Sequence, residues 1–84
     1  MASVKTDSEI DNAARKAIEA LYGKDVTDFN IRVVFPFPNE KKRDSWDVQV
    51  TFIRNGIQYT VDLMIQEKDG EITSARLIDT MTPL

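Results

Sequence analysis

The sequence predicts an α+β fold in which one N-terminal helix packs on a four-stranded antiparallel sheet with strand order 1-2-3-4. Three observations support this prediction: one stretch with apolar residues at helical spacing, four later stretches with alternating apolar residues, and two glycine turns that separate the last three of them. Hairpin-linked strands form a meander, and the helix supplies a second layer. At 84 residues we expect one domain over 7–79, a disordered segment at 1–6 and a short tail at 80–84.

The helix is expected to occupy the stretch that ends at Gly23, a residue typical of helix C-termini. Thr6, Asp7 and Ser8 are candidate N-caps, and Glu9 adds negative charge at the positive end of the helix dipole. The apolar face is rich in alanine, so the helix can lie close to a sheet. Its members are Ile10, Ala13, Ala14, Ala17, Ile18 and Leu21.

The central hairpin, residues 46–65, is the most strongly specified element. Asn55-Gly56 suits a type I′ turn, in which both central residues have positive φ. A two-residue loop there brings the apolar residues of both strands to one face. The expected pairs are Trp46–Ile65, Val48–Leu63, Val50–Val61 and Phe52–Tyr59. Turn chemistry and alternation therefore agree on one register.

The first strand is expected over residues 29–35, ending at Pro36. Its alternation directs Ile31, Val33 and Phe35 into the core. Two prolines and a run of charged residues follow, which indicates a long exposed hairpin loop.

The last turn, Lys68-Asp69-Gly70, favours a three-residue loop with a G1 bulge, in which Gly70 is left-handed and Glu67 pairs with Glu71. In this register Thr73 faces Ile65 and Leu77 faces Val61, both on the core side. The same register sets Arg76 beside Asp62 on the opposite face.

The outer face of this sheet is expected to carry several apolar side chains among polar ones. Scattered apolar residues on a solvated sheet are ordinary, because folded proteins expose much apolar area. Alternatively they merge into a patch that a partner or a second copy covers. The residues concerned are Val34, Ile53, Met64, Ile72 and Ile78.

The composition restricts the chemistry that the chain can perform. There is no histidine and no cysteine, which removes the usual general base, the thiol nucleophile and the commonest metal ligands. Asp47 and Asp62 share the outer face, where paired carboxylates more often serve solubility than acid–base catalysis. No phosphate-binding glycine loop or calcium-loop spacing occurs. We therefore expect no enzyme, no cofactor and no metal.

The loop between Phe37 and Trp46 is the most unusual stretch. It brings three cations, Lys41, Lys42 and Arg43, close to aromatic residues, as single-stranded nucleic-acid sites do. Flanking acidic residues and a net charge of −3 weigh against phosphate binding. Phe37 lies between two prolines, and this rigid apolar tip could insert into a protein partner.

Three motifs carry a resemblance to a known fold group. They are Trp46-Asp47-Val48-Gln49-Val50, Gly56-Ile57-Gln58-Tyr59-Thr60-Val61 and Asp69-Gly70-Glu71-Ile72. With the alanine-rich helix before them, they resemble PepSY-type and cystatin-like helix-on-meander domains. PepSY domains are typically exported and are thought to restrain peptidases or act as interaction modules. The Gln-Val-Val-Ala-Gly loop of the cystatins is absent, so the resemblance implies no functional residue.

These observations favour a small protein-interaction or regulatory module, with a possible homodimer, that binds through the 36–45 loop, the outer sheet face or an edge strand. The alternative is a nucleic-acid-associated protein that uses the basic loop. The chain has no apolar run long enough to span a membrane and no secretory leader, so we expect a cytoplasmic protein that binds no membrane.

Overall fold

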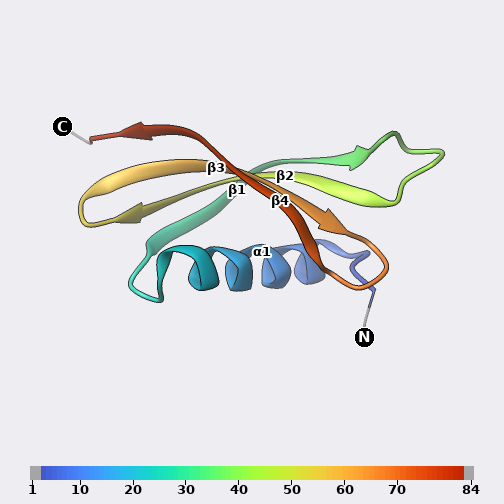
Figure 1. The fold of residues 1–84 in the computed structure, drawn as a ribbon, viewed down its shortest axis with the longest axis horizontal. Helices are drawn as coiled ribbons and strands as arrows, with labels where there is room; N and C mark the ends of the chain where they lie inside the picture. Colours follow the sequence, from blue (N-terminus) through green and yellow to red (C-terminus); the bar gives the residue numbers. More distant parts are fainter. Residues whose placement is uncertain (1–2, 83–84) are drawn as a thin grey trace.

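The computed structural model describes residues 3–82 and confirms the predicted class. Helix α1 (Asp7–Tyr22) precedes four strands, β1 (Thr27–Phe37), β2 (Ser45–Arg54), β3 (Ile57–Gln66) and β4 (Ile72–Met81), which form one antiparallel sheet in order β1-β2-β3-β4. The helix lies along one face, here called the inner face, and no helix or strand covers the outer face (Figure 1). Within residues 3–82 no helix is long and apolar enough to cross a membrane.

Helix α1 begins with a capping box between Thr6 and Glu9. The Thr6 hydroxyl accepts a hydrogen bond from the Glu9 N–H, and the Glu9 carboxylate accepts one from the Thr6 N–H. The pKa of Glu9 is lowered because its carboxylate accepts hydrogen bonds from the N–H of Lys5 and from the N–H and hydroxyl of Thr6. At the other end Gly23, with φ 103°, donates its N–H to the carbonyl of Glu19. The local chemistry therefore sets both ends of the helix.

The central hairpin has the predicted register throughout. Arg54 lies opposite Ile57, and all four predicted apolar pairs are present without an irregularity. Asn55 and Gly56 have φ angles of 54° and 75°, as a type I′ turn requires.

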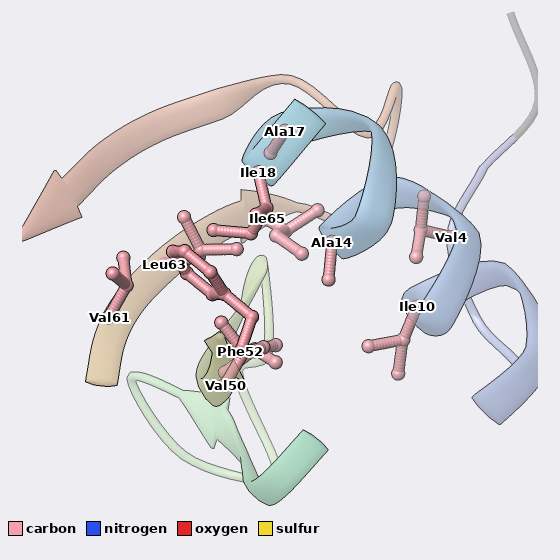
Figure 2. Close-up of a cluster of buried hydrophobic side chains, with 11 residues drawn as sticks. Val4, Ile10, Ala14, Ala17, Ile18, Val50, Phe52, Val61, Leu63 and Ile65 are labelled. Carbon is pink, nitrogen blue, oxygen red and sulfur yellow. The ribbon is translucent and has the colours of Figure 1, made fainter. Parts of the chain in front are cut away.

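The core lies between α1 and the two inner strands. Phe52 is fully buried, and its ring stacks on Tyr59 with centroids 5.2 Å apart and contacts Tyr22 at 5.0 Å. Figure 2 shows Phe52 among the buried apolar side chains, which converge from the helix and from both inner strands. The buried apolar residues are Val4, Ile10, Ala14, Ala17, Ile18, Val48, Val50, Phe52, Val61, Leu63 and Ile65.

The segment before α1, which we expected to be disordered, places Val4 in the core. Val4 is buried, its N–H donates to the Glu67 carbonyl at 2.7 Å, and its own carbonyl accepts from Trp46 Nε1 at 2.8 Å. The segment before α1 thus closes one end of the core, because these two hydrogen bonds satisfy its backbone while Val4 is removed from water. Residues 1–2 lie outside the described part.

Strand β1 changes its inward face part-way along, which the alternation did not predict. Ile31 lies opposite Val50, but Val33 lies opposite Gln49 and Val34 opposite Val48, so Arg32 is an extra, bulged residue. Beyond the bulge Val34 packs against the core. The prediction that Val33 and Phe35 face the core is therefore wrong, as is the expectation that Val34 lies outside.

Strand β4 also departs from prediction at its start. Ile72, not Thr73, lies opposite Ile65 and packs against the core, because Thr73 is bulged. The expected outer position of Ile72 is therefore wrong. Leu77 does lie opposite Val61 as predicted. The strand continues to Met81, so the expected tail is shorter than residues 80–84, and residues 83–84 are not described.

The turn before β4 is longer than expected. Gly70 is left-handed, with φ 75°, as predicted. However, the Gly70 N–H donates to the Gln66 carbonyl, and the Gln66 N–H donates to Glu71, so Glu71 pairs with Gln66. Glu67 is released from the hairpin, and its backbone binds the segments at Val4 and Asp44 instead.

Candidate protein-binding surface

Three apolar side chains of β1 lie together on the outer face. Val33, Phe35 and Phe37 follow the bulge at alternate positions, so they point to the same side of the strand. They are 39%, 58% and 47% exposed. We call these three residues the β1 patch. Their exposure is a direct result of the bulge at Arg32, because a β1 that paired regularly through Arg32 would direct Val33 and Phe35 into the core after Ile31.

The β1 patch adjoins a polar strip on β2. Val33 lies opposite Gln49, Phe35 opposite Asp47 and Phe37 opposite Ser45. Ser45 is buried, and Asp47 is partly buried. A partner that covers the patch therefore also meets hydrogen-bonding groups, which is the usual arrangement of a protein interface with an apolar centre and a polar surround.

Asp47 and Asp62 form an acidic pair beside the patch. Partial burial, a hydrogen bond with the Asp47 carboxyl and the charge of Asp47 together raise the pKa of Asp62 to about 6, although Arg76 acts to lower it. Asp47 Oδ1 is buried and has no hydrogen-bond partner within the described residues 3–82. A proton on Asp62 gives this oxygen a donor; otherwise a donor must come from a partner.

The loop between β1 and β2 is ordered by its own polar groups. The Asn39 side-chain oxygen accepts hydrogen bonds from the N–H groups of Lys41 and Lys42, both at 3.0 Å. The N–H of Asp44 donates to the Phe37 carbonyl and closes the loop. Both lysine side chains are exposed. The loop is therefore a defined turn that holds Phe37 at the end of the patch.

Arg43, the third predicted cation, is occupied within the protein. Its guanidinium donates to both carboxylate oxygens of Glu67, at 2.6 and 3.0 Å, and lies 4.4 Å from the centre of the Trp46 ring. The hydrogen bonds from Arg43 lower the pKa of Glu67. Arg43 therefore ties the loop to the turn before β4. Among the ion pairs of residues 3–82, Arg43 is the one member of the predicted basic cluster that takes part, and Lys41 and Lys42 do not.

A polar cavity of about 620 Å³ lies at the base of this loop. Its charges are mixed, with Lys5 and Lys68 on one hand and Asp44 and Glu67 on the other. The Arg43–Glu67 pair occupies part of its wall. Mixed charge does not favour a polyanion, so the cavity does not strengthen the nucleic-acid hypothesis.

The other predicted interaction residues are not brought together. Ile53 and Met64 are partly exposed on the outer face, but Met64 lies opposite Asp47, six residues along β2 from Ile53. Six residues span about 20 Å of strand. Ile78 is 47% exposed at the far edge, and Ile72 belongs to the core. These residues are therefore scattered, which agrees with the first of the two interpretations of the outer face and not with a single merged patch.

Sequence reasoning missed Val33 and Phe35 as surface residues. The one available signal was the doublet Val33-Val34, which breaks the alternation. Either valine can therefore be the one that faces the core, with alternate residues following it. In the structure Val34 is the inward one, because it lies opposite Val48, an inward residue of β2. The choice between the two valines depends on a bulge, which no residue near Arg32 specifies.

Comparisons with known proteins do not assign this surface. No protein-family model matches the chain, and no curated protein and no solved structure is significantly similar to it. The resemblance to PepSY-type and cystatin-like domains therefore stays a prediction. Among residues 3–82 no group of three or more acidic side chains is placed to hold a metal ion.

Proposed function

We propose that this protein is a non-catalytic interaction module that binds a partner protein through the β1 patch. One observation carries the proposal: the bulge at Arg32 turns three large apolar side chains toward solvent on one side of an edge strand. Aromatic side chains are enriched at the centres of protein interfaces, where polar groups form the rim. The matching partner surface is apolar and includes a hydrogen-bond donor for Asp47 Oδ1.

The arrangement of charges favours this function over the nucleic-acid alternative. Arg43 is paired with Glu67 and stacked on Trp46, so only Lys41 and Lys42 remain for phosphates. Lys42 and Lys41 lie on the loop, whereas the aromatic rings of the patch lie on the outer face of β1. A protein partner, in contrast, contacts the three apolar side chains of the patch directly. The expected cytoplasmic location stays a prediction.

The test compares capture by three forms of the tagged protein from a lysate of the source organism. Phe35→Ser removes the centre of the β1 patch, and Met81→Ser removes a side chain of similar exposure (56% compared with 58%) from the opposite edge. A specific partner is retained by the wild-type protein and by Met81→Ser and is lost by Phe35→Ser. Calorimetry with the purified partner should then show an affinity loss of about 30-fold or more for Phe35→Ser alone.

Two results would contradict the proposal. A protein captured equally by all three forms does not use the patch. Nucleic acid that co-elutes at low salt, and is lost when Lys41 and Lys42 are replaced by alanine, would support the alternative function.

A further inference from the structure

Strand β4 is an unprotected edge of the sheet. All its residues from Thr73 to Met81 are exposed, and it pairs only with β3. None of the backbone hydrogen bonds outside the sheet ladders of residues 3–82 involves these residues. The opposite edge, β1, contains Pro36, which lacks an N–H, whereas β4 contains no proline. A long edge without such protection is a template for a further strand.

The exposed side chains of β4 are unusually apolar for an edge. Leu77, Ile78 and Met81 are 50%, 47% and 56% exposed. Leu77 points to the inner face, opposite the fully buried Val61, but the helix does not cover it. Figure 1 shows the reason: β4 starts beside α1 and diverges from it toward its C-terminal end. The core is therefore open at this edge.

The helix continues this apolar surface. Leu21 is 56% exposed, and a groove of about 330 Å³ runs between α1 and the first half of β4. Small side chains line most of it, so another chain can approach closely. The lining residues are Ala17, Ala20, Leu21, Ile72, Thr73, Ser74 and Ala75.

We propose that β4 pairs antiparallel with β4 of a second copy of this chain, about a two-fold axis beside Leu77 and Ile78. The result is a continuous eight-stranded sheet with both helices on one face. Because the strands run in opposite directions, the uncovered half of each β4 meets the helix-flanked half of the other. Leu77 of each copy then lies beside Leu77 and Ile78 of the other, where its apolar surface leaves water, and Ala75 at the end of each groove lies opposite Thr80 of the other copy.

The charges of β4 are self-complementary about this axis. Arg76 and Asp79 lie on either side of the bulged residue Ile78, and both face outward, opposite Asp62 and Thr60. A two-fold axis between them sets Arg76 of each copy beside Asp79 of the other. Arg76 and Asp79 belong to none of the ion pairs within residues 3–82, although Arg76 neighbours Asp62. Two ion pairs per dimer therefore fix the register.

The surface area of the single chain is consistent with an additional interface. The chain exposes 5585 Å², compared with about 5100 Å² for a typical monomer of its 9.6 kDa mass. Its extents of 42 × 23 × 19 Å show that the excess comes with an elongated shape. Edge pairing of two copies would cover part of this excess.

The first measurement is the solution mass, by light scattering or sedimentation over about a hundredfold range of concentration. We expect twice 9.6 kDa at the upper end. A monomer throughout this range overturns the proposal. A dimer that also persists unchanged in both charge variants described next would show that β4 is not the interface.

Charge reversal supplies the specific test. Arg76→Asp leaves two acidic residues on each β4 and Asp79→Arg leaves two basic ones, so each variant alone repels its own copy. We expect self-association to weaken about tenfold or more in each. An equimolar mixture should form a heterodimer, because each acidic β4 then faces a basic one. Pairing within a chain cannot produce this recovery.

Arg32→Asp, on the other edge strand, is the matched control and should leave the dimer unchanged. A mixture of the two β4 variants that stays monomeric overturns the proposal. Circular dichroism on each variant establishes that the exposed substitutions leave the fold intact. The β1 patch lies at the far edges of the dimer, so Phe35→Ser should not change the mass, and failure of either proposal leaves the other standing.

Discussion

The two inner strands and the two edge strands of this sheet behave differently. β2 and β3 pair over ten consecutive residues without an irregularity, whereas β1 and β4 each contain two register shifts. An inner strand is held by hydrogen bonds on both sides, so an extra residue disrupts two ladders. An edge strand has one ladder, and a bulge there costs less. The edges are therefore where the chain can change which side chains it exposes.

This difference determines where the protein has apolar surface. The described residues include seven exposed large hydrophobic side chains, and six of them lie in the edge strands. They are Val33, Phe35, Phe37, Leu77, Ile78 and Met81. Both proposed interfaces consequently belong to the edges, while the central hairpin supplies the rigid support.

Deleting one residue is the strongest test of the difference. Loss of Gln49 from β2 moves half of the strand's apolar side chains to the outer face, and we expect no cooperative folding at 25 °C. Loss of Arg32 from β1 removes only the bulged residue and leaves the pairs of Ile31 and Val33 in place. We expect that variant to fold with a stability change of about 1 kcal/mol or less. Circular dichroism and urea titration measure both; equal effects would contradict the comparison.

A pair of phenylalanines gives the next largest contrast. Phe52 is fully buried against Tyr22 and Tyr59, so Phe52→Ala should lower the free energy of unfolding by about 3–5 kcal/mol. Phe35 is 58% exposed on β1, and Phe35→Ala should cost about 0.5 kcal/mol or less. Urea titration of both variants measures the difference. A large loss for Phe35→Ala would mean that its ring is part of the core.

The same difference explains how much of the fold could be predicted. Fold class, strand order and the register of the central hairpin follow from local signals that agree, namely the Asn55-Gly56 turn and strict alternation on both sides of it. The positive φ angle of Gly70 and the N-cap at Thr6 follow equally from local sequence signals. These features depend on a few neighbouring residues, which a sequence displays directly.

The features of the fold and of the candidate site that could not be predicted depend on contacts between distant segments. Nothing in the sequence near Val4 indicates that its carbonyl accepts a hydrogen bond from Trp46, 42 residues away. The bulge at Arg32 is chosen by the inward positions of β2, and it alone converts Val33 and Phe35 from core to surface. The candidate site was therefore predicted only at Phe37, since the residues that complete it depend on tertiary pairing.

The two hairpin glycines test whether the N-terminal segment tightens the edge turn. Both have φ 75°, but a Cβ on Gly56 would contact nothing within 4 Å, whereas one on Gly70 would lie 3.1 Å from Val4 Cγ2. We expect Gly56→Ala to cost about 1–2 kcal/mol and Gly70→Val about 2–3 kcal/mol, from left-handed strain plus the contact with Val4. Thermal unfolding measures both, and an unchanged melting temperature for Gly70→Val would contradict the left-handed turn.

The smallest expected effect lies at the acidic pair between the edges. The pKa of Asp62 is raised to about 6 in the folded state, compared with about 3.9 in an unfolded chain. The folded state therefore binds more protons between these values, and its stability falls as pH rises from about 4 to about 6. Since Asp62 is partly exposed, we expect the free energy of unfolding to fall by about 1 kcal/mol, which is less than the energy equivalent of the whole pKa shift.

Urea titrations between pH 5 and 7 isolate this group. Glu9 and Glu67 have lowered pKa values, so their contributions to the free energy of unfolding are complete above pH 5. These contributions are lost only in more acidic solution. Asp62→Asn should remove the pH dependence and stabilise the protein at pH 7 by about 1 kcal/mol, because an amide can donate to Asp47 Oδ1. Asp44→Asn, in the exposed loop, should retain the dependence. A wild-type stability that rises from pH 5 to 7 would contradict the raised pKa of Asp62, and a charged Asp62 would leave Asp47 Oδ1 dependent on a donor from a partner beside the β1 patch.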